Sequence, residues 1–202
     1  RPIKDMVIFA DSVQVSSKEE AQAVRISSFL SFQVTKNGEQ LLLKVAISTA
    51  NTEGALAGLK EITDWNFDKI RQQAENAWET ELSKVKVNSP DSDFKETFYT
   101  AAYHCYFAPF QFDDALGNYS GADGKIHSGK NIYTLNSLWD TYRAAAPLFT
   151  LTQTKRLPDI INSFLEFYRQ HGLLPSWELY FREANVMPGY HAVPIIADAI
   201  LK

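Results

Sequence analysis

The chain has 202 residues, 45 % hydrophobic and 22 % charged, a composition typical of a folded globular protein that buries a sizeable core. Its net charge of −4 argues against a nucleic-acid partner, and no apolar run approaches the ~18 residues of a membrane span. The single Cys105 excludes an internal disulfide framework. Aromatic residues make up 13 %, and such side chains can either fill a core or stack on sugar rings.

The two ends of the sequence lack the usual signals of termini. The first residues, RPIKDMVIFADSV, contain no initiator Met and no signal-peptide pattern. The last residues, AVPIIADAILK, predict a helix without a Gly or Pro to end it. We therefore expect a piece from the middle of a longer protein, in which the lack of a targeting signal says nothing about location.

The first 50 or so residues have the pattern of strands. Residues 24–34 and 41–49 are rich in β-branched and other apolar residues, and they flank the dipeptide Asn37-Gly38. Asn-Gly between two such runs is a strong hairpin signal, so we expect a hairpin of a β-sandwich here. Residues 50–62 contain two glycines, which favour a connector.

From Asn66 onward the apolar period becomes about 3.6, which predicts helices. A long amphipathic helix is expected over 67–85, with Asn66 as its N-cap and the role of a linker. A second helix is expected to begin at Asp91 or Ser92 and to end before Pro109. The apolar face of the first helix is formed by Phe67, Ile70, Ala74, Trp78, Leu82 and Val85.

The remainder of the chain predicts further helices separated by loops, with no strand between residues 93 and 202. Residues 110–132 form a long turn-rich loop, and such loops are usually functional or disordered. A helix is expected around SLWDTYR (137–143), and another over 155–171 with Pro158 in its first turn. A connector and the last helix follow, an order that suits an α/α toroid.

Asp140 and Arg143 lie three residues apart in an apolar segment, NSLWDTYRAAAPLF. One interpretation is an ion pair on a helix, in which the two charges neutralise each other. The other is that they face a cavity and hold a polar ligand, because charged residues are rarely buried without a partner. The residue pattern alone leaves both open.

Other candidate groups give weaker signals. Glu183 is either a solvated loop carboxylate or a site residue, and His191 is either a satisfied core histidine or a ligand-binding group. The loop FDDALGNYSGADG (112–124) lacks the ligand spacing of an EF-hand, so turn chemistry explains it. Cys105 lies on an apolar helical stripe, which argues against a nucleophilic thiol. We identify no catalytic residue and no metal ligand in this range.

Five segments occur in an order that resembles glycoside hydrolase family 92, the calcium-dependent α-mannosidases. SLWDTYR together with VMPGYHAVPIIADA is the more specific part of this resemblance, which runs over nearly the whole chain. The five segments are ETFYTAAYH, GNYSGADGKIH, YTLNSLWDTYRAAAPLFTL, GLLPSWEL and EANVMPGYHAVPIIADAILK.

The resemblance implies a mixed fold, in which an N-terminal β-sandwich is joined by helices to an (α/α)6 toroid barrel. Residues 1–62 would be the end of the sandwich, 63–92 the helical linker, and 93–202 the first part of the barrel. It also implies inverting hydrolysis of α-mannosidic bonds in mannose-containing glycans, α-1,2 bonds among them, with a bound Ca²⁺. The acid, the base and the calcium ligands of the family lie further along the chain, so we expect these 202 residues alone to be inactive.

The resemblance also assigns site residues. Asp140 matches the aspartate that faces mannose, with Arg143 orienting it and Trp139 shaping the pocket wall. Glu183 is a second candidate, and His191 is included among the substrate-binding residues. Phe181-Arg182 departs from the Gly-Asn that the family often has, and Ala146 replaces a larger residue, so the linkage preference is expected to differ from that of typical members.

Two other hypotheses remain at this point. One is another (α/α)6 glycosidase, trehalase-like or glucosidase-like, and the other is a non-catalytic carbohydrate-binding or structural member. The family resemblance further implies an exported bacterial protein, in the periplasm, at the surface or secreted.

Overall fold

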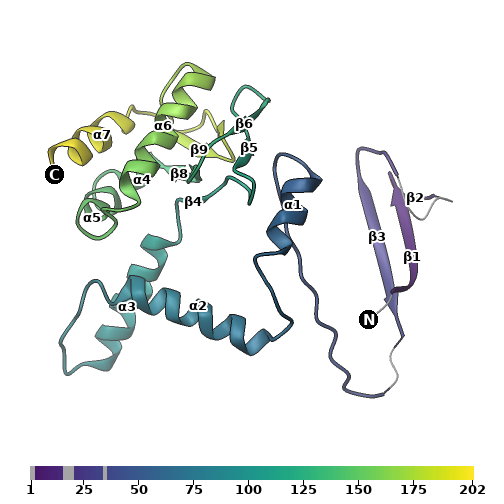
Figure 1. Ribbon diagram of the computed structural model, residues 1–202. Coiled ribbons are helices and arrows are strands. Elements are labelled where there is room, and N and C mark those ends of the chain that lie inside the picture. Colours follow the sequence, from purple (N-terminus) through teal and green to yellow (C-terminus); the bar gives the residue numbers. More distant parts are fainter. Residues whose placement is uncertain (1–2, 16–20, 34–35) are drawn as a thin grey trace. The chain divides into compact units, whose positions relative to one another are not determined.

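The computed structural model describes residues 3–15, 21–33 and 36–202 (Figure 1). The chain divides into two compact units, residues 1–44 and 45–202. The first unit contributes strands and the second mainly helices, so the content is mixed β and α. The domain boundaries at residues 62 and 92 stay predictions. Among the described residues, no helix has the length and apolarity to cross a bilayer.

The first unit contains a three-stranded antiparallel sheet in the order β2-β1-β3. Its long pair joins β1 (Ile3–Ala10) to β3 (Ile26–Phe32), with Met6 opposite Leu30. The short β2 (Val13–Gln14) pairs with the end of β1. The predicted strand over 24–34 is therefore confirmed over its central part.

The predicted hairpin around Asn37-Gly38 is wrong. A turn forms at this dipeptide, but residues 41–49 are not a strand, and the partner of β3 is β1. A turn signal specifies only the local reversal, whereas a strand needs an edge to pair with along its length. The large apolar side chains of this segment are exposed, Leu43 at 73 % and Ile47 at 87 %.

The predicted connector over 50–62 is a helix instead, α1 (Thr52–Leu59). The Asn51 side chain caps it by accepting a hydrogen bond from the Gly54 N–H at 2.9 Å. Gly54 is buried against Asp114, whose Oδ2 accepts a hydrogen bond from Ser48 Oγ at 2.7 Å. Glycine therefore serves close packing here and does not interrupt the helix.

The two predicted helices that follow are confirmed, with their caps. In α2 (Phe67–Leu82), the Asn66 side chain accepts from the Lys69 N–H at 3.0 Å. In α3 (Ser92–Tyr106), Asp91 takes the same role. The helices contact each other through the rings of Trp78 and Tyr103, whose centroids are 4.5 Å apart.

The C-terminal helices share one apolar core. The predicted SLWDTYR helix is only α4 (Leu138–Thr141), separated from α5 (Ala145–Thr152) by a break in helical geometry at Ala144. The predicted helix over 155–171 is α6 (Leu157–His171), and α7 (Ala192–Leu201) packs on α5 and α6. The buried core residues are Leu138, Ala146, Phe149, Leu157, Ile160, Phe164, Ala192 and Ile195.

Short strands also occur in the second unit, so the expectation of no strand after residue 93 is wrong. These strands have two or three residues each, too few for a periodic pattern to reveal them. One sheet has the order β10-β9-β8, and two further pairs are β4–β7 and β5–β6. Their bounds are β4 (Phe110–Gln111), β5 (Asn118–Ser120), β6 (Ile126–Ser128), β7 (Tyr133–Thr134), β8 (Asn136–Ser137), β9 (Trp177–Leu179) and β10 (Arg182–Glu183).

The segment 110–132 is therefore not a structureless loop. It folds back through the β5–β6 hairpin, and its apolar side chains form a second core with α6 and the β9–β10 turn. The rings of Phe112 and Phe181 stack at 5.8 Å. Figure 1 shows these short strands gathered near α6. Pairing between segments far apart in the sequence gives order that the turn-rich composition did not predict.

Candidate functional site

Glu178 is a fully buried carboxylate in the central strand β9. Its side chain is 1 % exposed, and it is the one charged residue in the buried core among the residues that the structure describes. Thr134 Oγ1 donates to Oε1 at 2.5 Å and Asn136 Nδ2 donates to Oε2 at 2.7 Å. The Phe181 N–H also donates to Oε1. Burial raises the pKa of the Glu178 carboxyl, and these hydrogen bonds oppose the rise only in part.

The β9–β10 turn next to Glu178 has a strained backbone. Tyr180 and Phe181 both adopt left-handed conformations, with φ of 54° and 56°. Two left-handed residues between paired strands form the turn type that usually requires Asn or Gly. The Tyr180 N–H donates to Thr134 Oγ1 at 2.7 Å, so the same side-chain network holds both turn amides. Strain of this kind persists where the surroundings enforce it, often at functional sites.

Asp140 lies in the first turn of α4, directly after strand β8. It is exposed, and the Ser137 hydroxyl donates a hydrogen bond to its Oδ2. Trp139 beside it is 43 % exposed, an unusual position for so large an apolar ring. A carboxylate and an indole thus share one exposed turn, the combination that binds sugar hydroxyls and sugar faces.

Contrary to the expectation from the sequence, Arg143 does not contact Asp140. Its Nε donates to the Tyr142 hydroxyl at 2.6 Å, and its guanidinium carbon lies 5.2 Å from the centre of that ring. Arg143 lies beyond Tyr142, the C-cap of α4, and the Ser137 hydroxyl is the group that holds Asp140. Participation of Arg143 in binding a ligand stays a prediction.

Glu183 uses its carboxylate to organise the connector. Its Oε2 accepts from the Ser176 N–H at 2.8 Å and its Oε1 from the Trp177 N–H at 3.0 Å. The Ser176 carbonyl in turn accepts from the Leu138 N–H at 3.1 Å, which attaches this connector to α4. The backbone of Ser176 therefore links the two segments: its N–H bonds to Glu183, and its carbonyl bonds to the α4 residue Leu138, two positions before Asp140.

His191 occupies the N-cap position of α7 without a side-chain capping hydrogen bond, and its ring packs against Tyr142 with centroids 4.1 Å apart. Its Nδ1 is buried without a hydrogen-bond partner among the described residues. Tyr142 thus contacts both Arg143 and His191. A buried imidazole nitrogen without a partner is unusual. A binding role for His191 stays a prediction.

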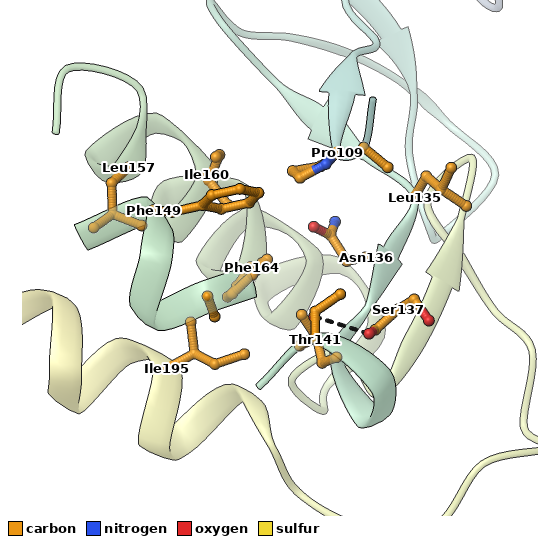
Figure 2. Close-up of a pocket in the computed structure, with 13 residues that line it drawn as sticks. Pro109, Leu135, Asn136, Ser137, Thr141, Phe149, Leu157, Ile160, Phe164 and Ile195 are labelled. Carbon is orange, nitrogen blue, oxygen red and sulfur yellow. Dashed lines mark hydrogen bonds between the residues drawn. The ribbon is translucent and has the colours of Figure 1, made fainter. Parts of the chain in front are cut away.

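An apolar cavity of about 180 Å³ lies beneath α4 (Figure 2). Figure 2 shows Asn136, Ser137 and Thr141 on one side and Phe149 and Leu157 on the other. The Thr141 hydroxyl donates to the Ser137 carbonyl at 2.9 Å, so the polar groups of this wall are already paired. The cavity is therefore not the candidate sugar site, because its polar groups are already paired. The candidate binding surface is the exposed turn at Asp140.

The side chains that could bind a metal ion are dispersed over the described residues, 3–15, 21–33 and 36–202. No group of three or more His, Cys, Asp or Glu in these ranges is arranged to hold a metal ion. The described ranges thus hold no cluster of three such side chains around which a Ca²⁺ ion could be bound.

The model of the glycosyl hydrolase family 92 catalytic domain matches residues 54–202. The chain belongs to glycosyl hydrolase family 92. Among solved structures of family 92, it is similar to the GH92 α-mannosidase BT3965 of Bacteroides thetaiotaomicron, at 35 % identity and a TM-score of 0.84. That match covers 98 % of this chain and 28 % of the other, and a structure of BT3965 in complex with mannoimidazole also matches.

Two further relatives match over most of this chain. The inverting mannosidase BT2199 of Bacteroides thetaiotaomicron is 26 % identical, with a TM-score of 0.83, over 99 % of this chain and 28 % of that one. An uncharacterized secreted glycosidase of Arthroderma benhamiae is 27 % identical over 185 residues, which are 89 % of this chain and 20 % of that protein. The chain therefore spans less than a third of the length of these relatives.

The sequence did not indicate the Glu178 network. Glu178 lies between Trp177 and Leu179 in the stretch SWELYF, and a carboxylate between large apolar residues is the signal that could have found it. Its partners Thr134 and Asn136 alternate with apolar residues in YTLNSL, which is the matching signal on the other strand.

Proposed function

We propose that the whole protein is a glycoside hydrolase that cleaves α-mannosidic bonds with inversion of configuration. The observation that carries this proposal is membership of family 92, together with 35 % identity to an α-mannosidase over 98 % of the chain. The relative BT2199 is described as an inverting mannosidase, which supports the stereochemical part. Family membership also argues against the trehalase-like and glucosidase-like alternatives.

Asp140 is proposed to bind hydroxyls of the mannose, with Trp139 forming the wall beside it. Only Oδ2 of Asp140 is hydrogen-bonded within the described part of the chain, so Oδ1 can accept from a sugar hydroxyl. Hydrogen bonds to an ionised carboxylate are stronger than neutral ones, which suits recognition of neighbouring hydroxyls. Arg143, Glu183 and His191 are proposed to complete the surface around this turn.

Inverting hydrolysis requires one carboxylic acid that protonates the leaving oxygen and one carboxylate that activates water on the opposite face. We propose that both belong to parts of the whole protein other than these 202 residues. The same holds for Ca²⁺, whose chemistry would be to hold sugar hydroxyls. No step proposed for the residues named above uses the metal.

The architecture and location are proposals of the same kind. Residues 1–62 are proposed to be the end of a β-sandwich, 63–92 a helical linker and 93–202 the first part of an (α/α)6 barrel, supported by the TM-score of 0.84 to BT3965. Export from the cell is supported by the name of the fungal relative, a secreted glycosidase. We also propose a preference for α-1,2 bonds.

The test uses the whole protein, purified and incubated with aryl α-mannoside, with aryl α-glucoside, and with α-1,2-, α-1,3- and α-1,6-linked mannobioses. Proton NMR at early times should show mannose released as the β-anomer, and a chelator should reduce the rate. Release of the α-anomer would contradict inversion. Binding of mannosides without hydrolysis would instead support the non-catalytic alternative.

A further inference from the structure

Glu178 lies between two strands that relate to predicted sugar-binding residues: β10 carries Glu183, and β8 leads directly into the turn of Asp140. In the sheet β10-β9-β8, Glu178 pairs with Asn136 on one side and with Glu183 on the other. Its carboxylate also accepts from Thr134 and from the turn amide of Phe181. A buried carboxylate costs free energy unless it is fully hydrogen-bonded, so its presence in this core needs an explanation beyond packing.

Strand β8 connects this buried network to the exposed turn. Successive side chains of a strand point to opposite faces, and the two residues of β8 follow this rule. Asn136 is 4 % exposed and donates to Glu178 at 2.7 Å, whereas the hydroxyl of the next residue, Ser137, donates to Asp140. One peptide unit therefore separates the hydrogen bond to Glu178 from the hydrogen bond to Asp140.

The other end of the network is the strained turn. Both left-handed residues, Tyr180 and Phe181, donate their amides into the pair formed by Thr134 and Glu178. The turn sets the course of β10 and hence the place of Glu183, which holds the Ser176 and Trp177 amides. Loss of the Glu178 carboxylate would leave this turn without one of its two side-chain acceptors.

We propose that Glu178 is a positioning residue: it fixes strand β8, and through Ser137 it fixes the place of the Asp140 carboxylate. This inference rests on the proposed function in one respect, the assignment of Asp140 to the sugar. Glu178 itself is buried and does not touch the substrate. Its contribution reaches the sugar through Asn136 and Ser137.

The experiment uses Glu178→Gln in the whole protein. Glutamine keeps the size of the side chain but presents an NH₂ group to neighbours that are themselves donors, Asn136 or Thr134 and the Phe181 amide. The matched control is Glu166→Gln, the same change at a surface residue of α6 that pairs with Arg169. Thr134→Val, which removes one donor and keeps the shape, replaces Glu178→Gln if that variant does not fold.

The first measurement is hydrogen–deuterium exchange of peptides that cover residues 134–142, with peptides of α2 as internal reference. We expect exchange at 134–142 to become at least roughly tenfold faster in Glu178→Gln, with α2 unchanged, because loss of a hydrogen bond to a charged group shifts local opening by about that factor. Exchange that equals the Glu166→Gln control would overturn the proposal. So would faster exchange spread evenly over both regions.

The second measurement is kcat/KM on an aryl α-mannoside for Glu178→Gln, Asp140→Asn and the double variant. If Glu178 acts through Asp140, the loss in the double variant is smaller than the product of the two single losses. Losses that multiply would overturn the route through Asp140. If the unsubstituted protein cleaves no mannoside but exchange at 134–142 still accelerates, the proposed function fails and the positioning of Asp140 by Glu178 stands.

Discussion

Gly189 lies directly against the imidazole ring of His191. A Cβ at position 189 would come within 2.1 Å of His191 Cε1 and 2.6 Å of Nδ1. The backbone of Gly189 also has a φ of +102°, which side chains rarely adopt. Glycine at this position therefore leaves room for the ring of His191 to pack against Tyr142.

The first prediction is that Gly189→Ala destabilises the protein by about 2 kcal/mol or more, because backbone strain and displacement of the His191 ring add together. Gly124→Ala is the control, since Gly124 has a φ of +76° but no atom within 4 Å of an added Cβ. Thermal unfolding of both variants separates the two effects. Equal changes in Tm would show that the contact with His191 has no cost.

The second prediction concerns two glycines of one helix. Gly→Ala in a helix normally stabilises by up to about 1 kcal/mol. At Gly54 we expect the opposite sign, because a Cβ would lie 1.8 Å from Asp114 Oδ2 and 2.9 Å from Ser48 Oγ. At Gly58 the nearest atom is Ala46 Cβ at 3.5 Å, so Gly58→Ala should stabilise. Denaturant unfolding measures the stability change of both variants. A stabilising Gly54→Ala would show that the Ser48 and Asp114 side chains can move away from the new Cβ without cost.

The third prediction is that Asp140→Asn in the whole protein lowers kcat/KM on α-mannosides by about 10- to 100-fold, since one charge-assisted hydrogen bond is lost. The loss should fall largely on kcat if that bond tightens in the transition state. Tm should change little, because Asp140 is exposed and makes no ion pair among the described residues. Asp68→Asn on α2, also exposed, is the control.

A normal kcat/KM per folded molecule in Asp140→Asn would remove Asp140 from the sugar site. A large drop in Tm would instead point to a structural role, which the contact with Ser137 alone does not predict.

The fourth prediction is a pH dependence at the contact between α2 and the start of α6. Burial raises the pKa of Glu81, but hydrogen bonds from Lys84 and Gln153 and the charge of Arg156 outweigh burial and lower it below its ordinary value of 4.5. The unfolded chain therefore binds more protons than the folded one as the pH falls through this range. The stabilisation is present at neutral pH and is lost as the pH falls through the folded pKa.

Glu81→Gln should thus cost a few tenths to about 1 kcal/mol at pH 7 and progressively less below pH ~4.5. Glu75→Gln on the same helix, whose surface pair with Arg71 spans 3.5 Å, should show a smaller and flatter effect. Unfolding free energies of both variants between pH 3 and 7 check the sign. A cost for Glu81→Gln that grows in acid would contradict it.

Helices α2, α3 and α6 were predictable because their signals are local. Asn66 and Asp91 cap the helices that the sequence predicted, and α6 begins and ends within two residues of expectation. The connector at Gly54 was misjudged because close packing against Asp114, and not flexibility, requires glycine there. Local sequence does not contain that information.

The candidate site was predictable only in part. The motif indicated Trp139 and Asp140 as candidates, but it predicted neither their exposure nor the contact of Arg143 with Tyr142, because Arg143 lies beyond the end of α4. The role of Glu178 was not predictable, because its hydrogen-bond partner Asn136 lies 42 residues away in the sequence. The Tyr180-Phe181 turn lacks the residues that normally signal its type.

That separation of 42 residues has a consequence for synthesis on the ribosome. Thr134 and Asn136 are made before Glu178, and at translation rates of 5–20 residues per second they wait roughly 2–8 s for their acceptor. During that interval the side-chain amide of Asn136 lacks its native acceptor and forms hydrogen bonds with water or with transient partners. The strand that leads to Asp140 therefore reaches its final place only after the segment around Glu178 has left the exit tunnel.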